Sequence, residues 1–128
     1  MIRRLLPAAL IVCVLWVQSS FAVRAQDLYQ EAADALFNLG LIDLTRAKEE
    51  NSGHDEAWKR ERAEHARQLF DQAEQVSPLD PDVPLALGET LRILGQVAGA
   101  RAQYERALKL GLPPSSESAV QATLSELN

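Results

Sequence analysis

The chain has 128 residues and a net charge of −5 at pH 7, because 18 Asp and Glu outnumber 13 Lys and Arg. An acidic protein is repelled by nucleic-acid phosphates and anionic lipid head groups, so direct nucleic-acid binding is not expected. The one cysteine, Cys13, lies in an apolar N-terminal run, so the rest of the chain has no thiol for disulfides, thiolate catalysis or zinc ligation.

Residues 1–25 have the order of a secretory signal peptide. An Arg-Arg pair precedes an apolar run of 13 residues, and small residues then offer cleavage sites after Ala22 or Ala25. The run is shorter than the roughly 20 residues of a membrane-spanning helix. We therefore expect an exported protein, periplasmic or secreted, whose mature domain covers residues 26–128 and does not insert into a membrane. The alternative is a retained segment that tethers the domain to a membrane.

Two long helices are predicted in the first half of the mature domain. Asp27–Glu50 has apolar residues at steps of three or four, the period of a helix, and a second such segment follows at Asp55–Val76. The turn-forming sequence NSGHD, residues 51–55, separates them. The apolar stripe of the first predicted helix consists of Leu28, Ala32, Leu36, Leu39 and Ile42.

Three shorter helices are predicted in the second half. A segment with three prolines, residues 77–84, ends the second long helix. Asp82 is placed to cap a third helix that ends near Gly95. A fourth covers Val97–Leu110, and a fifth follows the Pro-Pro pair after it. Because no stretch alternates with the period of a strand, the sequence predicts an all-α domain of five helices.

One segment of the chain is repeated at an offset of 34 residues. ARQLFDQAEQVSP, residues 66–78, matches ARAQYERALKLGLP, residues 100–113, with a small, an aromatic and a second small residue at equivalent places. An interval in the thirties is typical of stacked helical hairpins.

The second unit resembles the tetratricopeptide repeat family. Leu87-Gly88, a glycine at the helical turn and then Ala100, Tyr104 and Ala107 follow that family's pattern, in which small residues let two antiparallel helices approach and an aromatic ring fills the space between hairpins. The resemblance covers roughly residues 34–113, and the last helix has the place of a solvating cap. The residues expected to pack the repeat are Gly40, Ala66, Phe70, Ala73, Pro78, Leu87, Gly88, Ala100, Tyr104 and Ala107.

The first unit is longer than the family pattern. Gly40 and Ala66 are 26 positions apart, whereas the equivalent Gly88 and Ala100 are 12 apart. The surplus of 14 residues is about four helical turns. Divided between two helices, it predicts an extended first hairpin that projects beyond a regular second one.

The resemblance implies a concave groove that is formed by the first helix of each hairpin and accepts a peptide or helix of a partner protein. Such a groove suits a ligand with an apolar anchor and a basic side chain. The alternative is that Phe37, Leu41 and Leu44 are core residues. The residues that the resemblance places in the groove are Asp34, Phe37, Leu41, Asp82, Leu85, Glu89 and Arg92.

Catalytic and metal sites are not expected. His54 and His65 are eleven positions apart, which fits no short metal-ligand motif, and the charged segment around His65 is expected to face solvent. The glycines form no phosphate-binding cluster, and no serine has a base beside it in the sequence. We therefore expect no enzyme activity and no cofactor.

The sequence as a whole predicts an exported, non-catalytic adaptor or assembly factor of a bacterial cell-envelope complex that binds another protein. Two hairpins and a cap are fewer than the three repeats that such arrays usually need, so a homodimer is an alternative. In that alternative the protein is a structural homo-oligomer whose long hairpins pack together.

Overall fold

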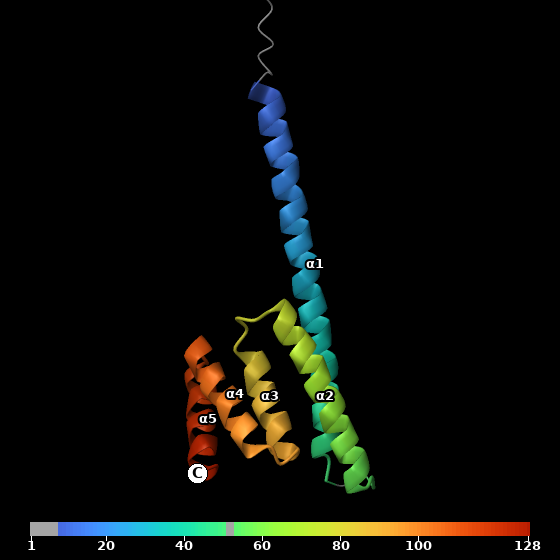
Figure 1. The fold of residues 1–128 in the computed structure, drawn as a ribbon, viewed down its shortest axis with the longest axis vertical. Coiled ribbons are helices and arrows are strands. Elements are labelled where there is room, and N and C mark those ends of the chain that lie inside the picture. The colour runs from blue at the N-terminus through green and yellow to red at the C-terminus, as the bar shows by residue number, and fades with distance from the viewer. Residues whose placement is uncertain (1–7, 51–52) are drawn as a thin grey trace, which may run out of the picture.

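The computed structural model describes residues 8–50 and 53–128, and over these residues it consists of five α-helices without a strand. Consecutive helices run antiparallel, so that the first two form a long hairpin, the next two a shorter one, and the fifth covers the second hairpin (Figure 1). The predicted all-α fold of antiparallel hairpins, with an extended first hairpin and a C-terminal capping helix, is confirmed. The helices are α1 (Ala8–Lys48), α2 (Glu56–Val76), α3 (Asp82–Ile93), α4 (Val97–Leu110) and α5 (Pro114–Glu126).

The first helix is longer than predicted. It has 41 residues and begins at Ala8, not at Asp27. Neither glycine nor proline occurs in its first 32 residues, so nothing in the sequence interrupts the helical backbone. Residues 11–32 are exposed, and this part of α1 projects beyond the other helices (Figure 1). The cleavage sites predicted after Ala22 and Ala25 lie in this projecting part.

The face of α1 that packs against the other helices differs from the predicted apolar stripe. Leu28, Leu39 and Ile42 of that stripe are 66%, 53% and 49% exposed, whereas its Leu36 is half-buried and packs against the core around Phe70. Helical period identifies an apolar face, but it does not say which face a neighbouring helix covers. The residues of α1 that are buried instead include Ala33, Gly40, Leu44 and Ala47.

An aromatic ring lies against a glycine in each hairpin. A Cβ atom added at Gly40 would lie 2.5 Å from Cε1 of Phe70, and one added at Gly88 would lie 2.7 Å from Cε1 of Tyr104. Both rings are buried, with at most 2% of either residue exposed. The two hairpins therefore repeat the same contact, in which a ring on the second helix occupies the space that a side chain on the first helix would need.

Two apolar clusters connect the hairpins and the cap. Around Phe70, the first cluster joins Leu44 of α1 to Val83 and Leu87 of α3. In the second cluster, Tyr104 and its neighbours on α3 and α4 meet Val120 of α5. The small residues of the 34-residue repeat, which are fully buried, allow these helices to approach closely. They are Ala66, Ala73, Ala100 and Ala107.

Polar contacts add to the apolar packing between the elements. Arg106 of α4 pairs with Glu74 of α2 and donates from Nη2 to the carbonyl oxygen of Pro78 at 3.2 Å. Pro78 is itself exposed, so it takes part in the repeat through its backbone and not by burial. At the other end, Arg101 donates to the Leu127 carbonyl oxygen at 2.8 Å, which ties the end of α5 to α4.

The starts of α2 to α5 lie within a residue or two of the predicted ones. Asp55, one residue before α2, caps that helix by accepting the Trp58 N–H at 2.9 Å. Asp82 is the first residue of α3 and not its cap, and its own N–H donates to Oδ1 of Asp80 at 2.9 Å.

We expect Gly88→Ala to lower the free energy of unfolding by about 1–3 kcal/mol, the usual cost of overpacking a close-packed core. The buried Tyr104 ring has little room to move away from the new methyl group. Urea unfolding followed by circular dichroism measures the change. Gly99→Ala is the control, because its Cβ would meet only the end of the Leu91 side chain at 3.3 Å. An equal loss in both variants would contradict the ring–glycine contact as the cause.

Candidate binding groove

An open hollow of about 240 Å³ lies between α1 and α3, the first helices of the two hairpins. Each helix contributes one side of it. The α1 side consists of Phe37, Leu41 and Leu44, and the α3 side of Asp82, Leu85, Ala86 and Glu89. Five of the seven residues that the sequence placed in a groove thus line one hollow: Phe37, Leu41, Asp82, Leu85 and Glu89.

The floor of the hollow belongs to the core of the first hairpin. Leu44 is 4% exposed and packs in the same cluster as Phe70, so for this residue the core alternative holds. Phe37 is half-buried, and its ring centroid lies 5.6 Å from that of Phe70 in a tilted arrangement. Leu41 is 36% exposed, and Leu85 faces it across the hollow as a half-buried residue. The apolar surface offered to a ligand is therefore held in place by the core beneath it.

The rim of the hollow is mainly acidic. Asp82 is exposed at the start of α3, and Glu89 lies two turns further along the same helix. Lys48 at the end of α1 pairs with Glu89, with Nζ 3.2 Å from Oε2, and joins the first helices of the two hairpins. Because both partners of this pair remain well exposed, the contact is weak and a ligand can compete for it.

The side chain behind this rim is a neutral tyrosine. Burial raises the pKa of Tyr104, the positive charge of Arg92 partly opposes this rise, and the negative charge of Glu89 adds to it. The phenol of Tyr104 is therefore uncharged at neutral pH.

Two predicted groove residues lie outside the hollow. Asp34 is one turn before Phe37 and accepts a hydrogen bond from Nε2 of Gln30 at 2.9 Å on the exposed surface of α1. Arg92 is exposed near the end of α3, one turn beyond Glu89. Both flank the hollow along its helices without lining it.

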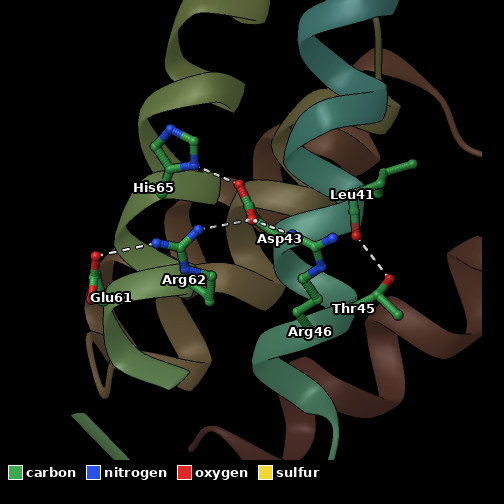
Figure 2. Close-up of polar contacts among 7 residues, drawn as sticks. All are labelled: Leu41, Asp43, Thr45, Arg46, Glu61, Arg62 and His65. Carbon is green, nitrogen blue, oxygen red and sulfur yellow. Dashed lines mark hydrogen bonds and ion pairs between the residues drawn. The ribbon is translucent and has the colours of Figure 1, made fainter. Parts of the chain in front are cut away.

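A buried carboxylate that the sequence analysis did not single out lies on another side of α1 (Figure 2). Asp43 is 6% exposed, and its Oδ2 accepts a hydrogen bond from Nδ1 of His65 on α2 at 2.5 Å. Its other oxygen forms ion pairs with Arg62 of α2 at 3.6 Å and with Arg46 of α1 at 3.9 Å. His65 is itself exposed, as expected for this charged segment, but its Nδ1 and the Arg62 guanidinium also contact the buried carboxylate of α1.

The position of Asp43 follows from its spacing to Gly40. Residues three apart lie on the same side of a helix, so Asp43 shares the packed face of Gly40 and is carried toward α2. A carboxylate placed there needs cationic or N–H partners, because an unpaired buried charge is costly. The basic residues of α2 supply them.

This cluster is a contact between α1 and α2. His65 has its carboxylate partner, but no serine, threonine or cysteine contact to it is seen in the described residues, and a nucleophile next to the base is needed for covalent catalysis. In the part of the chain that the structure describes, no group of three potential metal ligands comes together. The described helices include none with both the length and the apolar character to cross a membrane.

Comparison of the chain with protein-family models, with curated proteins and with solved structures found no match in any of the three.

We expect Asp43→Ala to lower the free energy of unfolding by about 1–3 kcal/mol, because it leaves His65 and Arg62 without their common acceptor. In a double-mutant cycle with His65→Ala, the two changes should couple by about 0.5–3 kcal/mol. Urea unfolding of the four proteins gives this coupling energy. Glu61→Ala is the control, since the exposed Glu61 pairs with Arg62 but should change stability by less than about 0.5 kcal/mol. Strictly additive effects of Asp43 and His65 would contradict the contact.

Proposed function

We propose that this protein is an exported adaptor of the tetratricopeptide-repeat type that binds a partner protein in the hollow between α1 and α3. The observation that carries the proposal is the convergence of residues from two hairpins on one preformed site: Phe37 and Leu41 from the first, Leu85 and Glu89 from the second. In this function the protein recognises its partner and performs no chemistry.

The size of the hollow supports a side chain of a partner as its occupant. Sites for small molecules and cofactors usually enclose about 300–1,000 Å³. The hollow of about 240 Å³ is smaller and open, which suits one anchoring side chain of a peptide or helix lying across it. The core holds the walls of the hollow in place. Binding of a ligand therefore costs little entropy for ordering the site.

The chemistry of the walls selects the ligand. Leu41 and Leu85 present apolar surface to an aliphatic or aromatic side chain. Asp82 and Glu89 on the rim, with Asp34 beside it, favour a basic residue next to that anchor. The ligand we propose is therefore an apolar residue flanked by Lys or Arg on a partner protein of the cell envelope.

We expect selection of phage-displayed random peptides on the protein to enrich sequences with an apolar residue next to Lys or Arg. A synthetic peptide from that selection should bind Leu85→Asp/Glu89→Lys at least tenfold more weakly, because one change removes the apolar wall and the other reverses the rim charge. Fluorescence anisotropy with the labelled peptide measures the affinities.

The control for this experiment is Leu79→Asp, which makes the same Leu-to-Asp change as in the double variant, at a residue that is 78% exposed and outside the hollow. It should bind the peptide with unchanged affinity. Equal weakening in both variants, or enrichment of acidic peptides, would refute the groove. The same pair of variants, used in affinity capture from the native cell-envelope extract, then identifies which bound proteins depend on the hollow.

Export requires that the N-terminal segment act as a signal peptide. We expect the protein isolated from its native cells to begin at Val23 or Gln26, because cleavage after Ala22 or Ala25 removes the apolar run. Intact-mass spectrometry of the isolated protein measures this. A full-length mass would favour the alternative of a tethered domain.

A further inference from the structure

An apolar stripe on α1 has no partner among the residues that the structure describes. Leu28, Leu39 and Ile42 are each about half exposed or more, and Ala32 and Ala35 between them are exposed as well. The hollow lies elsewhere on the helix, since none of these residues lines it. We call Leu28, Ala32, Ala35, Leu39 and Ile42 the outer stripe.

The outer stripe has the spacing of a coiled-coil seam. Its residues advance by four, three, four and three positions, which is an average of 3.5 residues. This spacing keeps one line of side chains facing a second helix of the same kind, with each side chain inserted between those of its neighbour. The next position in the series is Arg46, whose side chain is 54% exposed. A stripe of this kind indicates that the missing partner is another helix.

The charges along α1 match those of a second α1 that runs in the opposite direction. Between residues 26 and 45 the helix has acidic residues and no Lys or Arg, and Arg46 and Lys48 follow at its end. Parallel pairing would place acidic turns against acidic turns. Antiparallel pairing places Arg46 of one helix opposite Leu28 of the other, within reach of the exposed Glu31. In a dimer with two-fold symmetry, this contact of Arg46 with Glu31 of the other copy occurs twice.

We propose that the outer stripe is a homodimer interface, in which α1 of one copy packs antiparallel against α1 of a second copy. From Leu28 to Arg46 the paired segment is about 27 Å long at 1.5 Å per residue. Ala35 lies near its middle and Ala32 about one turn before it, and these small side chains allow the two helices to approach closely. Much of this part of α1 already packs against α2, so association does not have to form the helix.

This interface is separate from the proposed binding function. The hollow and the outer stripe use different residues of α1, so that a dimer would carry two free hollows. The outer stripe also lies wholly within residues 26–128 and persists whether or not the N-terminal segment is removed. An experiment that refutes the dimer interface therefore does not refute binding in the hollow, and the reverse also holds.

Sedimentation velocity of the full chain tests the interface. We expect the protein to sediment with twice the mass of one chain at micromolar concentration, and Leu39→Glu/Ile42→Glu to sediment as one chain with unchanged circular dichroism. Both residues are exposed in the single chain, so the fold tolerates the change. Leu79→Glu, which introduces one such charge at an exposed residue away from the outer stripe, should keep the dimer. A monomeric native protein, or a dimer that survives in the double variant, would overturn the proposal.

The direction of pairing is tested with a spin label at Leu28→Cys in a Cys13→Ser background. Antiparallel pairing separates the two Leu28 positions by about 27 Å along the axis, whereas parallel pairing places them about 8–10 Å apart. Pulsed electron paramagnetic resonance measures this distance. The long distance supports the interface as described, and the short one refutes its antiparallel arrangement.

Discussion

The contact of an aromatic ring with a glycine is the constraint on which the rest of the structure depends. Phe70 lies over Gly40 and Tyr104 lies over Gly88, and in each pair a Cβ on the glycine would overlap the ring. The contact fixes the distance between the two helices of a hairpin and their rotation about their own axes. Rotation of α1 then decides which of its residues face α2, which face α3 and which remain outside.

The first helix takes part in three surfaces because of that rotation. Its packed face, which contains Gly40 and Leu44, forms the core with α2 and α3. A second face presents Leu41 to the hollow, above side chains that the core immobilises. The outer stripe is directed away from both. A helix with apolar residues on several faces is suited to hold a fold together and to bind partners at the same time.

The first hairpin has a buried polar contact that the second lacks among the described residues. Asp43, three positions after Gly40, is buried between α1 and α2 and is bound by His65 and Arg62 of α2. An unpaired carboxylate buried there would be unfavourable. Its hydrogen bond and ion pairs form only when the two helices are aligned in one register. The cluster therefore specifies alignment over a stretch where small apolar residues such as Ala47 and Ala63 offer little shape to do so.

The sequence by itself determined the helices and the repeat, because both depend on neighbours along the chain. Apolar residues at steps of three or four, and the prolines and glycines between them, predicted five helices and the bounds Val97–Leu110 of α4. The positions equivalent in the two units, counted from Gly40 and Gly88, gave seven predicted groove residues. Five of these line the hollow.

Only the tertiary structure decided how α1 is used. Its sequence contains two apolar stripes of helical period, and most of the one chosen from periodicity is left exposed, because the ring of Phe70 lies against Gly40 on another face. Of the predicted stripe, Leu36 packs against the core. The burial of Asp43 followed from the same choice. Periodicity describes one helix, whereas the face that becomes buried is set by the shape of the helix packed against it.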